Sequence, residues 1–192
     1  MTELLLVRHG ETDWNFVGRW QGNSDTPLND AGREQARALA DTLERVDAIY
    51  SSDLARARET AEILAERLGL PVHLDVRLRE RGFGSWEGLT SAEIEERFPD
   101  SYRRWRAGHG PGTDDAEPFD AFADRIRSLV EEVLREHPDE TVLIVAHGGS
   151  IRVVHALARD LDYVRDHASI PPVPNCVVAR FAAQDGKLTP ID

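Results

Sequence analysis

Two short apolar runs stand out in this chain, and each is followed at once by a histidine. Residues 4–7 precede Arg8 and His9, and residues 142–146 precede His147. A run without polar residues is typical of a strand that is buried on both faces of a sheet. Ligands of open α/β sheets bind beyond the carboxyl ends of the strands, so we expect both histidines at one edge of the sheet.

The segments around these two runs alternate between helical and strand patterns. Apolar residues spaced three and four apart predict helices over residues 30–43, 54–68, 119–133 and 151–158. Thr90 and Glu93 form a capping box that predicts the start of a further helix, and Asn29 or Asp30 is the expected cap of the first. Shorter apolar segments predict strands at residues 48–50, 72–74, 176–182 and 188–191.

Strands that alternate with helices predict an α/β fold with a mainly parallel sheet covered on both faces, connected by right-handed crossovers. No linker or change of composition divides the chain, so we expect one domain over residues 1–192. Residues 14–28, 78–88 and 106–118 have the composition of loops.

Charge limits the classes of partner. The chain of 192 residues has 23 Lys and Arg against 35 Asp and Glu, a net charge of -12. This balance argues against a nucleic-acid partner, and an anionic substrate would need a local group of arginines. Lys187 is the only lysine, which excludes Schiff-base and P-loop lysine chemistry from the expected site.

Several features favour a cytoplasmic protein. The apolar runs are too short to span a bilayer, and no basic segment followed by an apolar stretch begins the chain. Cys176 is the only cysteine, so no disulfide can form within the chain, which suits a reducing compartment. The sequence leaves open whether the chain acts as a monomer or as a homodimer.

A metal site is the first alternative for two converging histidines. However, neither His9 nor His147 lies in a His-x-His or His-Glu-x-x-His pattern or beside a pair of aspartates. The sequence therefore favours a site without a metal or other cofactor.

The chain resembles the histidine phosphatase superfamily, the phosphoglycerate-mutase-like proteins, in six stretches that occur in the same order. This resemblance implies a three-layer αβα fold. The matching stretches are residues 8–12 with Asn15, Gln21 and Gly22 with residues 25–28, 51–57, 78–80, 84–88 and 146–148.

The resemblance also implies catalytic roles. His9 would be the nucleophile that becomes a phosphohistidine, and its pKa should be lowered by nearby arginines. Arg8, Arg56 and His147 would surround the phosphoryl oxygens, while Glu80 would act first as general acid and then as general base. The matching positions that would contact the substrate are Asn15, Gln21, Gly22 and Gly148.

Two alternatives remain to the role of Glu80 as general acid and base. Arg79 and Arg81 flank Glu80 and could make it a structural ion pair, or keep it ionised and a poor acid. Glu87 is the other carboxylate of the same loop, although its stretch is mostly structural in the superfamily.

Within the superfamily, the sequence favours a phosphatase acting on a small phosphorylated metabolite. The loop Gly18-Arg19-Trp20-Gln21-Gly22 resembles that of the small phosphatases, and the segment between Trp105 and Phe119 is shorter than in the mutases. The alternatives are a cofactor-dependent phosphoglycerate mutase and a non-catalytic protein that binds phosphorylated ligands.

Two further features concern the substrate. The chain has Asp114-Asp115-Ala116-Glu117 where many phosphatases of the superfamily have Gly-Gly-Glu-Ser, which leaves the role of this acidic loop open. We also hypothesise that two of the four tryptophans form apolar walls of the pocket.

Overall fold

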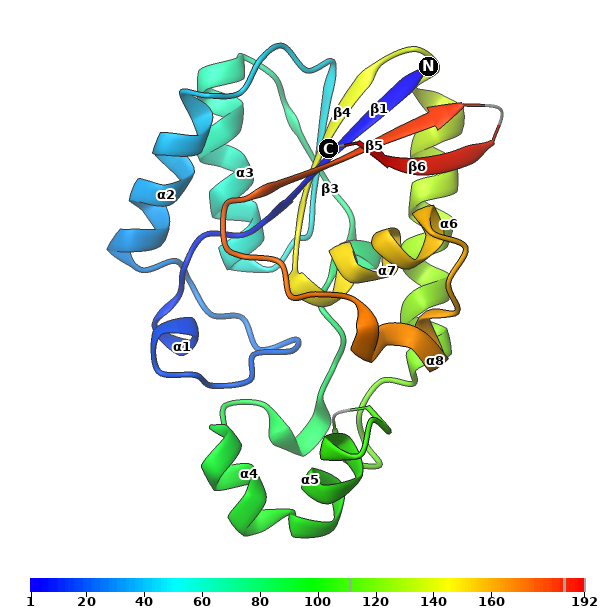
Figure 1. Cartoon of the computed structure of the whole chain (residues 1–192). Coiled ribbons are helices and arrows are strands. Elements are labelled where there is room, and N and C mark those ends of the chain that lie inside the picture. The colour runs from blue at the N-terminus through cyan, green and yellow to red at the C-terminus, as the bar shows by residue number, and fades with distance from the viewer. Residues whose placement is uncertain (111, 185, 192) are drawn as a thin grey trace.

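The computed structural model describes residues 1–110, 112–184 and 186–191. Its centre is a six-stranded sheet with the strand order β3-β2-β4-β1-β5-β6 (Figure 1). The strands are β1 (Thr2–Arg8), β2 (Ala48–Ser51), β3 (Val72–Leu74), β4 (Thr141–Ala146), β5 (Val178–Gln184) and β6 (Lys187–Ile191).

The first four strands form the parallel part of the sheet. β1 pairs with β4, β4 with β2 and β2 with β3 in parallel, whereas β5 and β6 add two antiparallel pairings beside β1. This arrangement confirms the predicted mainly parallel sheet. Arg8 lies opposite Ala146 in the register, so β1 and β4 end level with each other.

Helices cover both faces of the sheet and complete the predicted three layers. Helices α2 (Asp30–Ala40) and α3 (Ala55–Leu68) pack with Leu5 and Val7 on one face. Helices α6 (Phe119–Glu136) and α7 (Gly148–Ala158) pack with Leu4 and Leu6 on the other. Neighbouring residues of β1 point to opposite faces, so both sides of the strand are buried, as its apolar run indicates.

The shorter helices lie where the sequence predicted loops or one continuous helix. Helix α1 (Asp13–Phe16) interrupts the predicted loop 14–28, because Thr12 and Asn15 form a capping box that starts a helical turn. The helix predicted after Thr90 is divided into α4 (Ser91–Arg97) and α5 (Pro99–Arg106). The break falls at Phe98, because Pro99 has no N–H to continue the first helix.

The remaining elements lie near the carboxyl ends of β1 and β4. They are α8 (Tyr163–Asp166) and the 3-10 turns η1 (Val76–Leu78), η2 (Gly84–Trp86) and η3 (His167–Ser169). In Figure 1, α4 and α5, in green, lie below the sheet on the side where β1 and β4 end. Over the described residues, no helix is both long and apolar enough to cross a membrane.

Candidate active site

His9 directly follows β1 and is almost fully buried, with 2% of its surface exposed. Its Nδ1 lies 2.7 Å from the carbonyl oxygen of Gly10. A carbonyl oxygen can only accept, so Nδ1 carries the proton and Nε2 keeps its lone pair. The side-chain amide of Asn175 donates to the carbonyl of His9 over 2.7 Å, which fixes the backbone at this point.

His147 follows β4 and is fully buried. Its ring centroid lies 5.2 Å from that of His9, so the level ends of the two strands bring the predicted histidines together. The Nε2 atom of His147 lies 2.9 Å from the hydroxyl of Ser52, whereas its buried Nδ1 has no hydrogen-bond partner among the described residues.

Arg8 and Arg56 bring positive charge to the histidines. Arg8 donates to the carbonyl of Val173 over 2.7 Å, and Arg56 donates to those of Ser24 and Gly22, each over 2.8 Å. In the described part of the chain, neither guanidinium forms an ion pair with a carboxylate, and the Nε of each is buried without a partner. These arginines therefore keep donors and charge that the protein itself does not satisfy.

The charges and the burial act together on the two imidazoles. Burial lowers the pKa of His9 well below 6.5, and the positive charges of Arg56 and Arg8 lower it further. Burial also lowers the pKa of His147 well below 6.5, with Arg56 as the next cause. Burial lowers the pKa of Arg56 to about 10, which leaves it charged at neutral pH. Two neutral imidazoles thus face two cationic guanidinium groups.

Glu80 presents its carboxylate to the same site. Oε1 accepts from the backbone N–H of Arg81 over 2.8 Å, and Oε2 accepts from that of Gly149 over 2.9 Å. Arg79 pairs instead with Asp53 at 2.5 Å, so the sequence-based alternative of an Arg79–Glu80 ion pair is wrong. The Nε of Arg81 donates to the carbonyl of Glu117 over 2.6 Å.

Glu87, the alternative carboxylate, joins two loops. Its Oε1 accepts from the backbone N–H groups of Asn23 and Phe83, each over 3.0 Å, and its Oε2 accepts from the hydroxyl of Ser24 over 2.9 Å. Among the described residues that line the cavity around His9, Glu80 is present and Glu87 is absent, so these contacts give Glu87 a structural role.

Two adjoining cavities lie beside His9 and Glu80. The smaller, of about 270 Å³, is lined by His9, Arg8, Arg56 and Glu80 among others. The larger, of about 480 Å³, extends over α7, α8 and the end of α5. Residues that line both cavities are Arg8, Trp20, Glu80 and Phe83. The smaller cavity thus brings His9, Arg8, Arg56 and Glu80 together, and the larger offers space beside them, whereas His147 is not among the described residues that line either cavity.

Comparison with known proteins decides the family. The model of the histidine phosphatase superfamily (branch 1) matches residues 4–190. The chain belongs to the histidine phosphatase superfamily. The family resemblance seen in the six sequence stretches is thereby confirmed.

Individual relatives of this superfamily member are phosphatases. A metal-independent phosphoserine phosphatase of Arabidopsis thaliana is 40% identical over 163 residues, which are 81% of this chain and 68% of the relative. A glucosyl-3-phosphoglycerate phosphatase of Mycobacterium tuberculosis is 41% identical over 163 residues, 80% of this chain and 73% of the relative. The predicted phosphatase class is confirmed by these similarities.

Solved structures agree with the sequence matches. A mycobacterial glucosyl-3-phosphoglycerate phosphatase in complex with VO3 superposes with a TM-score of 0.90 at 36% identity and covers 98% of this chain and 96% of its own. A phosphoserine phosphatase of Entamoeba histolytica in complex with 3-phosphoglyceric acid gives a TM-score of 0.87 at 28% identity. The match covers 100% of this chain and 96% of that structure's chain. The predicted fold of the superfamily is confirmed.

The residues expected to contact the substrate of this histidine phosphatase superfamily member divide between the two cavities. Asn15, Gln21 and Gly22 line the smaller cavity, and Gly148 lines the larger at the start of α7. The Oε1 of Gln21 accepts from the hydroxyl of Thr26 over 2.6 Å, and Asn15 Oδ1 takes part in the α1 capping box.

The tryptophans of this superfamily member differ in their exposure to the cavities. Trp20 and Trp105 line the larger cavity, with their rings edge to face at 5.1 Å, whereas Trp86 is fully buried behind them. Trp14 lines the smaller cavity. Two tryptophans therefore form apolar walls of the larger cavity, as hypothesised. Among the described residues, no group of three or more His, Cys, Asp or Glu is arranged to hold a metal ion.

Several residues that support the site are not among those predicted from the sequence motifs. Ser52 contacts His147 and lies within the matched stretch 51–57, which was a usable signal. Thr60 accepts from the backbone N–H of Gly10 over 3.0 Å, and Asn175 contacts the carbonyl of His9. Nothing in the sequence around Thr60 or Asn175 indicates these contacts, because each depends on segments far apart in the chain.

Proposed function

We propose that this chain is a metal-independent phosphomonoester hydrolase that transfers the phosphoryl group to Nε2 of His9 and then to water. The observation that carries the proposal is the state of His9. Its Nδ1 donates to the Gly10 carbonyl, its pKa lies well below 6.5, and it lines one cavity with Arg8, Arg56 and Glu80. A neutral imidazole with an available Nε2 beside unpaired arginines is a nucleophile placed in an anion-binding site.

In the first step, Nε2 of His9 attacks phosphorus while the bond from phosphorus to the ester oxygen breaks. Protonated Glu80 gives its proton to the leaving oxygen, so an alcohol departs and the phosphoryl group remains on nitrogen. Glu80 lines both cavities, which supports this role, because the leaving group would extend from the smaller cavity into the larger.

In the second step, the Glu80 carboxylate takes a proton from water as the water oxygen bonds to phosphorus. The bond from phosphorus to Nε2 breaks, inorganic phosphate is released, and Glu80 is again protonated. One carboxyl group thus serves as acid and then as base, and the enzyme returns to its starting state.

Arg8, Arg56 and His147 would stabilise the charge on the transferring group. If the Ser52 hydroxyl donates to Nε2 of His147, the proton lies on Nδ1, which would donate to a phosphoryl oxygen. Such fixed donors are worth about a hundredfold or more in turnover each. Arg56 and Arg8 also lower the pKa of His9, so they would support both the nucleophile and the transition state.

We propose small phosphorylated hydroxy acids as substrates. Among its described lining residues, the larger cavity has Arg8, Arg81, Arg106 and Arg152 but only one carboxylate, Glu80. In a protein of net charge -12, this local excess of arginine favours a leaving group with a carboxylate. The substrates in the names of two relatives, phosphoserine and glucosyl-3-phosphoglycerate, both have this chemistry.

The deciding experiment is turnover of p-nitrophenyl phosphate with a chelator present, by the wild type and by His9→Ala. We expect chelator-resistant hydrolysis in the wild type and none above background in the variant, because His9→Ala removes the attacking nitrogen. Rapid acid quenching with labelled substrate should trap one phosphoryl group on the wild-type protein. Full activity of His9→Ala would exclude the proposed nucleophile.

The mutase alternative is tested in parallel with 3-phosphoglycerate and 2,3-bisphosphoglycerate. We expect isomerisation to be negligible beside hydrolysis. Isomerisation far above hydrolysis would identify a mutase, and turnover of no phosphate ester would favour the non-catalytic binding protein.

We also propose that the protein works in the cytoplasm. The single cysteine, Cys176, has no second cysteine with which to form a disulfide within the chain, which suits a reducing compartment. Fractionation of cells that express the untagged chain tests the compartment, and light scattering of the purified protein tests whether it is a homodimer.

A further inference from the structure

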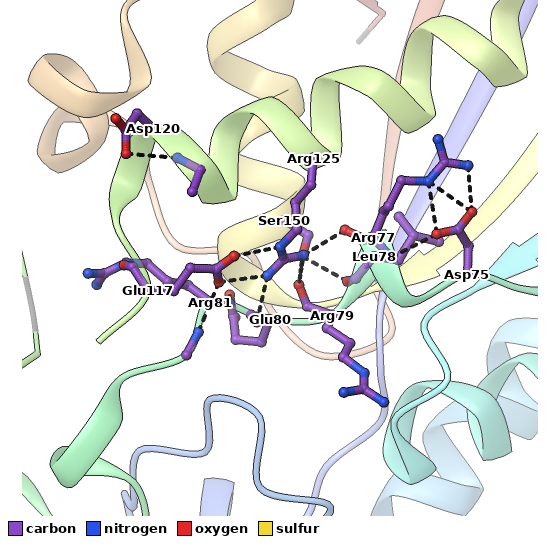
Figure 2. Close-up of polar contacts among 12 residues, drawn as sticks. Asp75, Arg77, Leu78, Arg79, Glu80, Arg81, Glu117, Asp120, Arg125 and Ser150 are labelled. Carbon is purple, nitrogen blue, oxygen red and sulfur yellow. Dashed lines mark hydrogen bonds and ion pairs between the residues drawn. The ribbon is translucent and has the colours of Figure 1, made fainter. Parts of the chain in front are cut away.

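The loop that presents Glu80 is held by side chains from helices α6 and α7, and one of them contacts three of its backbone carbonyls. Arg125 lies on α6, and its guanidinium group reaches across to residues 77–80 (Figure 2). Nη1 donates to the carbonyls of Arg77 and Arg79, each over 2.6 Å, and Nη2 donates to the carbonyl of Glu80 over 3.0 Å. Three carbonyl oxygens of the Glu80 loop thus meet one guanidinium.

The other donors of Arg125 are directed at Glu117. Nε lies 2.7 Å from Oε1 of Glu117, and Nη2 lies 2.8 Å from Oε2, which gives a two-point contact between two planar groups. A guanidinium has five N–H groups, and these contacts use all five. The orientation of Arg125 is therefore fully determined by its partners.

Glu117 extends the attachment to the far side of Glu80. Its Oε2 accepts from the backbone N–H of Gly82 over 3.2 Å, its own N–H donates to the carbonyl of Gly82 over 2.9 Å, and its carbonyl accepts from Arg81. The loop is thus held before and after Glu80. This gives the last residue of the acidic 114–117 loop a role that the sequence left open.

The part of helix α6 that carries Arg125 is anchored in the hydrophobic core. Phe122 and Ile126 on α6 are fully buried in the core, and the Arg125 guanidinium lies 4.7 Å from the centre of the Phe122 ring. From the neighbouring helix α7, the Ser150 hydroxyl contacts the carbonyl of Leu78 at 3.1 Å, and Gly149 contacts the Glu80 carboxylate. Helices α6 and α7 therefore both hold the backbone of the loop, and α7 also holds the Glu80 carboxylate.

We propose that Arg125 is a positioning residue for the reaction, which sets the place of the Glu80 carboxylate through the loop backbone. The inference rests on the proposed role of Glu80 as general acid and base. An acid must lie within hydrogen-bond distance of the leaving oxygen, and a misplacement of about 1 Å can cost about a hundredfold in rate.

The consequence depends on the leaving group. p-Nitrophenolate departs readily without a proton, whereas an alkoxide such as that of phosphoserine needs the acid. Loss of correct Glu80 placement should therefore slow phosphorylation of His9 by an alkyl ester far more than phosphorylation by p-nitrophenyl phosphate. General destabilisation of the fold would slow both equally.

The test measures the His9 phosphorylation rate by rapid quench with both esters in the wild type, Arg125→Met, Arg125→Lys and Glu80→Gln. We expect Glu80→Gln and Arg125→Met to slow phosphorylation by phosphoserine, the latter by about ten- to a hundredfold. Phosphorylation by p-nitrophenyl phosphate should change by less than about threefold. Arg125→Lys should resemble Arg125→Met, because an ammonium cannot match five acceptors in a plane.

Glu132→Gln is the matched control. Arg77 of the same loop contacts Glu132 on α6 through both oxygens, at 2.9 and 3.1 Å, without touching the Glu80 carbonyl. Breaking this contact should leave the ratio of the two rates unchanged. Glu117→Gln, which keeps the carbonyl contacts of Arg125, should change the ratio in the same direction but less, and replaces Arg125→Met if that variant does not fold.

Equal slowing of both esters by the Arg125 or Glu117 variants, or no slowing, would overturn the positioning role. The proposed function is judged separately by the wild type, which must form the His9 phosphoenzyme with p-nitrophenyl phosphate. A wild type that fails there refutes the hydrolase mechanism, whereas a normal wild type with an unchanged ratio in the variants refutes only the role of Arg125.

Discussion

The position of one proton decides what His9 can do. The Gly10 carbonyl fixes the proton on Nδ1, and burial together with Arg56 and Arg8 keeps a second proton off Nε2. The same positive charges would attract the phosphate. The groups proposed to bind the phosphate thus also keep the His9 imidazole unprotonated at Nε2.

At the residue scale, Arg56→Gln should raise the pKa of His9 towards 6.5 and lower turnover by about a hundredfold or more. The pKa rises because a nearby positive charge no longer disfavours the imidazolium. Burial is the larger cause of the lowered pKa and remains, so the rise will be partial. NMR titration of ring-labelled histidine in the free protein measures it. An unchanged His9 titration would show that Arg56 has no influence on the nucleophile.

At the scale of elements, the site lies where the ends of two strands and the start of one helix come together. β1 and β4 end level and present His9 and His147, while α7 begins with two glycines that lie close to Arg8 and Glu80. The lack of a side chain at Gly149 lets the helix start approach the Glu80 carboxylate. The site therefore depends on free space at Gly149 as well as on its charges.

Gly149→Ala tests this space. An added Cβ would overlap the Glu80 carboxylate and come within 3.2 Å of the Phe122 ring, so we expect the carboxylate to be displaced and turnover to fall by about a hundredfold. At Gly148, an added Cβ meets Arg8 atoms at 3.8 Å, an ordinary contact, and the loss should be smaller. Steady-state kinetics and thermal melting of the two variants make the comparison. Equal turnover in both would contradict the steric argument.

The elements differ in how far the sequence could predict them. Buried strands and amphipathic helices leave a periodic pattern, so β1, β4, α3 and α6 were predicted from their residues. Helix α1 was missed, because four residues are too few to show a helical period. Arg125 was missed for another reason, because its partners are mostly backbone carbonyls. Every residue has a backbone carbonyl, so the sequence does not indicate which of them a side chain contacts.

At the scale of the whole molecule, the buried neutral histidines make folding sensitive to acid. The pKa values of His9 and His147 are lowered in the folded state, so below about pH 6.5 the unfolded chain binds more protons than the folded one. The free energy of unfolding therefore decreases as the pH falls from about 6.5 towards the folded-state pKa values.

We predict that the urea midpoint falls between pH 7.5 and pH 5.5, and that His147→Gln reduces this fall. Each pH unit over which one such histidine stays neutral costs about 1.4 kcal/mol. His109→Gln, at an exposed histidine, is the control and should keep the wild-type dependence. Urea unfolding followed by tryptophan fluorescence gives the midpoints. A fall of the same size in His147→Gln would contradict the assignment of this acid sensitivity to the buried site.

The contacts of Asn175 and Cys176 make the backbone at the end of β1 depend on a segment that is distant in the sequence. Asn175 donates to the carbonyl of His9, and the N–H of Cys176 donates to that of Arg8 over 2.9 Å. Asn175 and His9 are 166 positions apart in the sequence, so this contact forms only when the long chain between them has been placed. Local opening of residues 175 and 176 would therefore release the backbone of His9 while the paired strands of the sheet stay folded.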